Sequence, residues 1–251
     1  MKRALSCILI AAIALFAAGC QNHQSAGITK PVQQAEPIAT ANEMNQGEVG
    51  MSKGSHSFRT EEIWCKNGSK NIYGVAYIPD TDQEKYPLVI FSHELGNSHT
   101  SGERYAERLA EAGYAAYTFD FCGGTVGGNK SDGTNKEMSV LTEASDLEAV
   151  MEASKSWDFV DEDRIFLLGG SMGGLVTTVV GCTHQDEISG MILMYPALSA
   201  KEDIGMERYA AKDEVPEDIS LFGGWIHVGK NYILDLWDTD FNQLLASYQG
   251  D

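Results

Sequence analysis

The sequence predicts an α/β domain in which a mostly parallel sheet carries helices on both faces. From residue 58 onward, strand-like apolar runs alternate regularly with segments of helical spacing, and this alternation is typical of parallel sheets with crossover helices. Residues 87–92 form a continuous apolar run, as expected of a strand covered on both faces. With 251 residues, 43% of them hydrophobic, the chain is long enough to bury a sizeable core.

Each element follows from its local pattern. The turn Asn67-Gly68-Ser69 separates the first two strands and indicates a hairpin, and Gly113 ends the first helix. A loop rich in Gly, Asn and Ser follows the fourth strand, at residues 123–133. The predicted strands are residues 63–66, 71–78, 87–92, 114–119, 164–168 and 188–195, and the predicted helices are residues 103–112, 140–153, 175–181 and 241–248.

Residues 199–240 interrupt this alternation. The segment holds four basic residues against ten Asp and Glu, and it carries several large aromatic side chains. An insertion of this length between a strand and the next helix is more often functional than structural filler. For any one of its aromatic residues, packing of the insertion on the core is the simpler interpretation.

Charge and composition exclude several classes of function. The formal net charge is −18, and no block of basic residues follows the first few positions, which argues against nucleic-acid binding. No two histidines or cysteines stand at metal-ligand spacing in one segment, so we expect neither a metal nor another cofactor. Cys65, Cys122 and Cys182 are expected to be buried free thiols.

The N-terminus has the pattern of an export signal. Lys2 and Arg3 precede a short apolar run that ends in small residues before Cys20, which predicts a lipoprotein signal peptide at residues 1–19. Cys20 would then be lipidated and anchor the exported protein to the bacterial cell membrane, on its extracytoplasmic side. The alternative is an ordinary cleaved signal in which Cys20 has no role. Residues 20–57 are polar and predict a flexible tether.

Residues 169–173 read Gly-Gly-Ser-Met-Gly, which fits the pattern G-x-S-x-G. A predicted strand precedes the pattern and a predicted helix follows it, and this is the context of a nucleophile elbow. Ser171 is therefore the candidate catalytic nucleophile, placed at a helix N-terminus that favours developing negative charge. The alternative is a glycine-rich turn with a helix-capping serine.

A serine nucleophile also needs backbone N–H donors for the oxyanion that it generates. Met172, the residue after the nucleophile, is one candidate donor, and Leu95, in the loop after the strand at residues 87–92, is the other. His93 lies in the same loop. We expect it to support the oxyanion loop, the alternative being a general base.

Residues 92–103, 117–124 and 138–143, together with the elbow, resemble the α/β-hydrolase superfamily, and most closely the bacterial cinnamoyl (feruloyl) esterases and related carboxylesterases. The resemblance covers residues 58–251. It implies a serine hydrolase that cleaves small carboxylic esters through an acyl-enzyme, with a bulky or aromatic acyl group such as cinnamoyl or feruloyl. It also implies that residues 199–240 form a lid over the acyl pocket.

Two departures from the family pattern stand out. Glu94 occupies a position where the family usually has Gly, and we expect its carboxylate to point away from the oxyanion loop. The family's triad continues with Asp and then His after two further strands, whereas no histidine of this sequence stands at such a position. The α/β-hydrolase domain at residues 58–251 is therefore expected to be incomplete, with the last two strands missing.

These departures leave three hypotheses for function. The chain is part of an exported esterase whose C-terminal portion is absent from this sequence, or a truncated and inactive hydrolase relative, or a surface lipoprotein that binds a small ligand without turning it over. Peptidases and acyltransferases share the same motif spacing and stay open as well.

Overall fold

The computed structural model describes residues 56–250. Its eight strands are β1 (Phe58–Asn67), β2 (Lys70–Pro79), β3 (Tyr86–Ser92), β4 (Ala115–Phe119), β5 (Val160–Gly170), β6 (Gly190–Met194), β7 (Asp218–Leu221) and β8 (Ile226–Gly229). The α-helices are α1 (Glu103–Glu111), α2 (Val140–Ser154), α3 (Ser171–Thr183), α4 (Ala200–Asp203), α5 (Lys230–Asp238) and α6 (Phe241–Ala246). The 3-10 turns are η1 (His99–Gly102), η2 (Met206–Arg208), η3 (Lys212–Glu214) and η4 (Phe222–Gly224).

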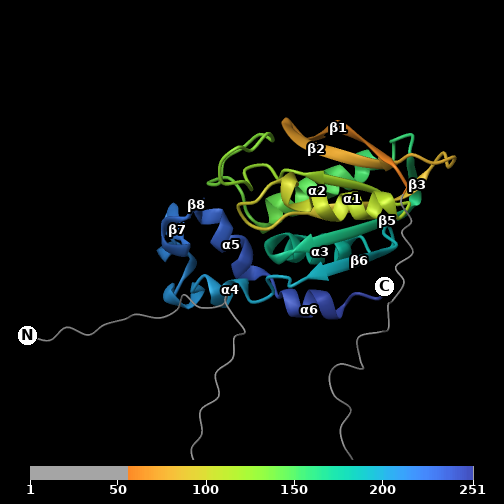
Figure 1. Ribbon diagram of the computed structural model, residues 1–251. Helices are drawn as coiled ribbons and strands as arrows, with labels where there is room; N and C mark the ends of the chain where they lie inside the picture. The colour runs from red at the N-terminus through yellow and green to blue at the C-terminus, as the bar shows by residue number, and fades with distance from the viewer. Residues whose placement is uncertain (1–55, 251) are drawn as a thin grey trace, which may run out of the picture. The chain divides into compact units, whose positions relative to one another are not determined.

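Six of the strands form one sheet in the order β1-β2-β4-β3-β5-β6 (Figure 1). The strands β4, β3, β5 and β6 pair in parallel, and β1 and β2 join as an antiparallel hairpin at one side. A mostly parallel sheet of this kind confirms the predicted fold class. Because the carboxyl ends of β3, β5 and β6 meet at one edge, the loops that follow them lie together.

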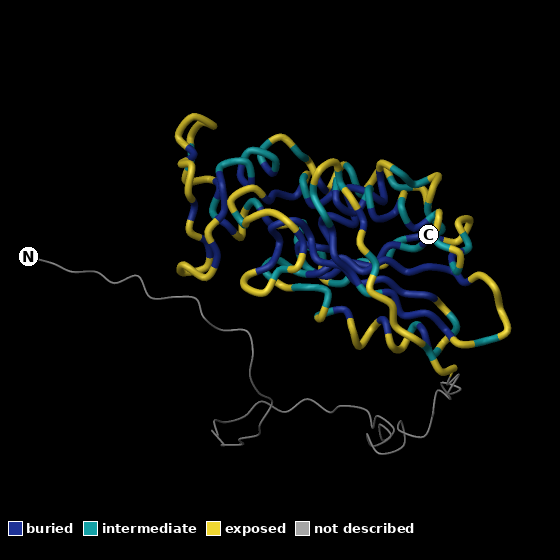
Figure 2. Tube along the Cα trace, turned by 90° about the horizontal axis from the view of Figure 1, so that it is seen from above, coloured by how far each residue is buried: buried dark blue, intermediate teal, exposed yellow. Residues whose placement is uncertain are grey.

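Helices cover both faces of the sheet. The larger core lies between the sheet and α2 and α3, and Ile90, Leu147 and Leu175 are fully buried in it. On the opposite face α1 packs against β2 and β4 through Ala106 and Ala110. The strands run through the buried centre in Figure 2, whereas exposed residues are concentrated in the loops and along the outer helices.

The elements match the predicted ones in order, and most extend one to six residues beyond the predicted bounds. The insertion is more regular than expected: it contains the antiparallel hairpin β7–β8 and the helix α5, neither of which the pattern predicted. Ile219, Val228 and Leu236 from these elements are buried in the same core cluster as the sheet residues. The insertion therefore folds as part of the domain's core.

Strand β6 is an edge strand of this sheet, although four of its five residues are large and apolar. Ile192 is 49% exposed, because the layer formed by α1 lies over β2, β3 and β4. None of the helices described here is long and apolar enough to span a bilayer. Cys65, Cys122 and Cys182 are buried free thiols, as predicted.

The predicted signal peptide at residues 1–19, the lipidation site Cys20 and the tether up to residue 55 lie outside the described residues. These stay predictions of the sequence.

The stability of the domain should depend on the α2 face that the core buries. Replacing Leu147, which is fully buried, by Ala should lower the free energy of unfolding by about 2–5 kcal/mol through lost burial and a residual cavity. Leu141 lies on the same helix and is 44% exposed, so Leu141→Ala is the matched control. This substitution should change the free energy of unfolding by less than about 0.5 kcal/mol. Urea unfolding measures both, and equal losses would contradict the assigned burial.

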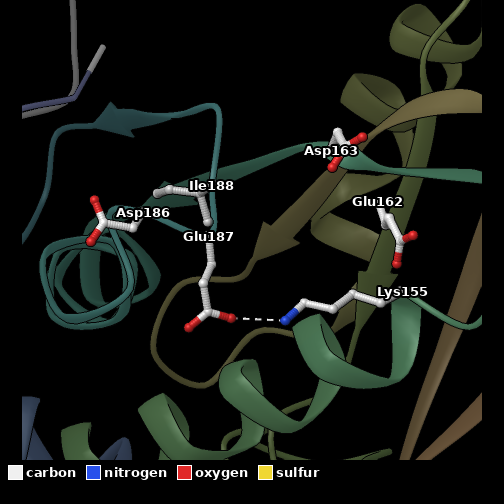
Figure 3. A pocket seen from close by; sticks show the side chains of 6 residues that line it. All are labelled: Lys155, Glu162, Asp163, Asp186, Glu187 and Ile188. Atoms are coloured by element: carbon white, nitrogen blue, oxygen red, sulfur yellow. Dashed lines mark hydrogen bonds and ion pairs between the residues drawn. The ribbon is translucent and has the colours of Figure 1, made fainter.

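A charged network joins α2 to the segment after α3. His184 follows α3, and its Nδ1 lies 2.8 Å from Oε1 of Glu187 while its Nε2 lies 3.2 Å from Oε1 of Glu148. Lys155 donates a second hydrogen bond to Glu187 at 2.8 Å (Figure 3). The hydrogen bond with Glu187, and then that with Glu148, raises the pKa of His184, and the contacts with His184 and Lys155 lower the pKa of Glu187 to about 2.

This network should make stability depend on pH. The pKa of His184 is raised in the folded protein, so protonated His184 stabilises the fold. This contribution to the free energy of unfolding is fully present below the unfolded-state pKa of about 6.5, and it is lost as pH rises through the folded-state pKa. His184→Gln should therefore cost about 0.5–1 kcal/mol at pH 6 and less at pH 8.5, measured by urea unfolding. His56→Gln is the control, since His56 forms no ion pair within residues 56–250. A cost of His184→Gln that does not change with pH would contradict the assignment.

Candidate active site

Ser171 stands at a sharp turn between β5 and α3. Its φ is 50°, which is the left-handed region that non-glycine residues rarely adopt. Such a conformation costs about 1–3 kcal/mol and persists only where the surroundings enforce it. The strand before the turn and the helix after it are the predicted context of a nucleophile elbow.

Two glycines of the motif permit this turn. A Cβ on Gly169 would overlap the carbonyl oxygen of Gly173, and a Cβ on Gly173 would overlap the carbonyl oxygen of Ser92 at the end of β3. The helix α3 therefore begins with its backbone against the backbones of β3 and β5. The spacing of the motif is required by this close approach.

The two candidate oxyanion donors flank the serine. Leu95 and Met172 line the same pocket as Ser171. Met172 lies in the first turn of α3, where backbone N–H groups lack partners within the helix. The loop of Leu95 is fixed to the loop after β4 by two backbone hydrogen bonds, from Gly96 N–H to Gly124 and from Val126 N–H to Gly96, each 2.9 Å long.

His93 is buried beneath this loop. Its Nε2 accepts a hydrogen bond of 3.2 Å from the backbone N–H of Phe121, so Nδ1 carries the proton and donates it to the carbonyl oxygen of Glu94 at 2.8 Å. Burial lowers the pKa of His93, which keeps the ring neutral. With both ring nitrogens bonded to the backbone, His93 has none left to accept a proton from Ser171. These two hydrogen bonds join the oxyanion loop to the segment after β4, and bonds of this kind suit the support role predicted for His93.

The expectation that the carboxylate of Glu94 points away from the oxyanion loop is wrong, because Glu94 lines the pocket together with Leu95 and Ser171. Tyr195 donates a hydrogen bond of 3.1 Å to Oε1 of Glu94, and the side-chain amide of Asn97 donates one of 3.0 Å to Oε2. A Cβ on Gly170 would lie 3.0 Å from Oε1 of Glu94 and 3.3 Å from the hydroxyl of Tyr195. The carboxylate thus occupies the space left by the absent side chain at Gly170, beside Ser171.

Tyr195 is a site residue that the sequence did not reveal. It follows β6 directly, and its φ of 40° is again left-handed. Sequence offered one weak signal, because residues just after a parallel strand lie at the edge of the sheet where sites form in α/β proteins.

A pocket of about 540 Å³ opens at Ser171. The sheet side contributes Glu94, Leu95, Ser171, Met172 and Ala197, and the insertion contributes Ala200, Asp203, Ile204, Phe222, Trp225 and Tyr232. Phe222 is 57% exposed and Trp225 is 50% exposed, so packing leaves about half of each residue accessible to solvent. The insertion therefore forms one wall of the cavity beside Ser171.

Two polar groups are buried close to this wall. Glu143 on α2 is fully buried, and burial raises its pKa well above the usual value. Burial also raises the pKa of Tyr232. Within residues 56–250, neither Oε1 of Glu143 nor the hydroxyl of Tyr232 has a hydrogen-bond partner.

His99 and His227 are engaged elsewhere. His99 binds the buried Asp120, with its Nδ1 2.7 Å from Oδ1, and His227 lies 2.9 Å from Asp218. In the part of the chain that the structure describes, no histidine lines the pocket of Ser171, and no group of three or more potential metal ligands occurs.

Solved structures share this fold. Est1E from Butyrivibrio proteoclasticus, solved with ferulic acid bound, superposes with a TM-score of 0.63 over 75% of each chain at 21% sequence identity. At this identity the likeness shows the fold alone.

Curated relatives match over part of their length. Mouse dipeptidyl peptidase 8 is 31% identical over 125 residues, which is 46% of this chain and 14% of that protein. The monoacylglycerol lipase of Mycolicibacterium smegmatis is 26% identical over 148 residues, 59% of this chain and 50% of the lipase. The chain thus spans half the length of these relatives or less.

The region that carries the elbow and the oxyanion loop also matches a family model. The match covers residues 83–222, more than half of the chain, and the family is described as serine aminopeptidase, S33. The chain therefore belongs to the serine aminopeptidase S33 family, within the α/β-hydrolase superfamily.

Proposed function

We propose that the protein is a serine hydrolase that cleaves small carboxylic esters, with Ser171 as the nucleophile. The observation that carries this proposal is the left-handed backbone of Ser171 at the mouth of a pocket that Leu95 and Met172 also line. A strained serine between a strand and a helix N-terminus, beside two backbone donors, is the arrangement that acyl transfer requires.

In the proposed reaction, Oγ of Ser171 bonds to the ester carbonyl carbon as its hydroxyl proton passes to solvent water. The carbonyl oxygen becomes an oxyanion that the N–H groups of Leu95 and Met172 stabilise. Collapse of this intermediate breaks the bond between the carbonyl carbon and the alcohol oxygen, and the released alcohol takes up a proton from solvent water. Water then attacks the acyl-enzyme and releases the acid, restoring Ser171. His93 contributes to this reaction by holding the oxyanion loop in place, and it contacts no reacting atom.

The shape of the pocket favours a bulky or aromatic acyl group. The rings of Phe222, Trp225 and Tyr232 line it, and its volume of about 540 Å³ lies in the range of small-molecule sites. The ferulic acid bound by Est1E is an acid of this kind. A peptide bond is the second candidate, since the family model and dipeptidyl peptidase 8 carry peptidase names.

We also propose that the protein is exported and anchored to the membrane through lipid on Cys20. Lys2, Arg3 and the short apolar run that ends at Cys20 support this proposal. The charge of the mature chain would repel anionic lipid, so acyl chains must supply the attachment.

Labelling with a fluorophosphonate probe tests the nucleophile. The wild-type chain should be labelled, and Ser171→Ala should abolish labelling and remove the ester hydrolysis that the chain catalyses, because no other hydroxyl occupies the elbow. Ser247→Ala, at the exposed end of α6, is the control and should label like the wild type. Equal labelling of the Ser171→Ala protein, or a wild-type chain that melts cooperatively and stays unlabelled, would contradict the proposal.

Fractionation of an expressing bacterium tests the anchor. The full chain should partition with membranes and incorporate labelled palmitate, and Cys20→Ser should remove both properties. Cys65→Ser is the control: it removes a buried thiol of the domain, and the protein should still partition with membranes and incorporate palmitate. Membrane association that persists without label in the Cys20→Ser protein would refute lipidation at this residue.

A further inference from the structure

An aromatic side chain of the insertion lies against the loop that carries Leu95. Gly96 follows Leu95 directly, and its φ of 72° is left-handed. A Cβ on Gly96 would overlap Cη2 of Trp225 and would lie 2.8 Å from Cζ2 of the same ring. The indole is therefore in van der Waals contact with the backbone of Gly96. Trp225 also lines the pocket of Ser171 together with Leu95.

This ring contact adds to the hydrogen bonds that hold Gly96. The N–H of Gly96 donates to the carbonyl oxygen of Gly124, and the N–H of Val126 donates to the carbonyl oxygen of Gly96. A Cβ on Gly96 would also lie 3.0 Å from Cγ2 of Val126. The loop after β4 thus fixes the backbone of Gly96, and Trp225 fills the space where a side chain at Gly96 would stand.

The hairpin β7–β8 sets the position of Trp225. Leu221 at the end of β7 pairs with Ile226 at the start of β8, and both side chains are buried in the core. Residues 222–224 all have positive φ, of 50°, 71° and 92°, so the chain turns tightly between these two strands. Trp225 immediately precedes Ile226. The indole is therefore carried by a short turn on a buried hairpin.

The other end of the hairpin is tied to the segment before α2. Lys136 pairs with Asp218 on β7 at 2.6 Å, and a Cβ on Gly229 of β8 would overlap the carbonyl oxygen of Lys136. The side-chain amide of Asn231 donates a hydrogen bond of 3.0 Å to the carbonyl oxygen of Glu137. The connection from β4 to α2 thus holds the hairpin as well as the oxyanion loop.

We propose that Trp225 is a positioning residue, whose indole on Gly96 holds the loop of Leu95 in place for the oxyanion. The inference rests on the proposed function, in which the N–H of Leu95 stabilises that oxyanion. Donors of this kind must be held within about 0.5 Å of their productive position. Removing one donor outright costs about 10²–10³-fold in kcat, so a donor that is only loosened should cost about 10-fold. The insertion then supports the chemistry as well as lining the acyl pocket.

Amide hydrogen–deuterium exchange tests the positioning without turnover. Trp225→Ala should speed exchange at the N–H groups of Gly96 and Val126 about 10-fold, and Trp225→Leu about 3-fold, because both hydrogen bonds open when the loop moves. Trp225→Phe keeps a ring at the contact and should restore most of the protection. Trp64→Ala removes an indole that is 54% exposed on β1 and is the matched control, which should leave this exchange unchanged. Unchanged exchange within β5 separates local loosening from unfolding.

Hydrolysis of 4-nitrophenyl acetate separates positioning from a simple wall of the pocket, because its acetyl group is small. Loss of oxyanion stabilisation in the Trp225→Ala protein should lower kcat for this ester about 10-fold and change KM by less than about 2-fold. A Trp225 that only lined the acyl pocket would instead raise KM for a bulky ester, 4-nitrophenyl cinnamate, and leave the acetate unaffected. Trp225→Phe should recover kcat for the acetate to within about 3-fold of the wild type.

The outcomes separate this inference from the proposed function. Unchanged exchange at Gly96 and Val126 in the Trp225→Ala protein, or equal acceleration by Trp64→Ala, would overturn the role of Trp225. An unchanged kcat for the acetate in a chain that hydrolyses it would also overturn that role. Exchange does not depend on whether Ser171 reacts. Accelerated exchange in a chain that no fluorophosphonate labels would therefore retain Trp225 as the residue that holds the loop and would reject the hydrolase.

Discussion

The approach of α3 to the ends of β3 and β5 is the constraint on which the candidate site depends. At Gly169 and Gly173 the helix backbone lies so close to the strand backbones that no side chain fits between them. This contact forces Ser171 into its left-handed conformation and sets the first turn of the helix opposite the loop of Leu95. Ser171 and both candidate donors thus owe their positions to close packing of the backbone.

The two walls of the pocket differ in how they are held. The sheet wall rests on the buried strands and on His93, whose ring joins the oxyanion loop to the loop after β4. The insertion wall has a buried base, in Ile219, Val228 and Tyr232, and an exposed rim that carries Phe222 and Trp225. A buried wall facing a more exposed wall suits a site in which the proposed chemistry is fixed and ligand choice can vary.

Sequence predicted the parts of the site that are encoded locally. The elbow follows from five consecutive residues and the elements on either side of them, and the order of strands and helices follows from hydrophobic periodicity. The orientation of Glu94 could not be predicted in this way, because it depends on Tyr195, a residue about one hundred positions away, and on the empty space at Gly170. The hairpin β7–β8 and the helix α5 escaped prediction because each element is short, with four residues in each strand and nine in the helix, and because their apolar residues pack on a distant core.

The pairing of β3 with β5 also bears on how the site arises as the chain folds. The loop of Leu95 follows β3 and Ser171 follows β5, and α1, β4 and α2 lie between these two strands in sequence. Parallel pairings of such separated segments form slowly, since the intervening chain must first be ordered. A chain that has assembled only its first four strands holds the loop of Leu95 without the serine. Reactivity at Ser171 would therefore arise late in folding, so a covalent label there would distinguish native molecules from partly folded ones in the same sample.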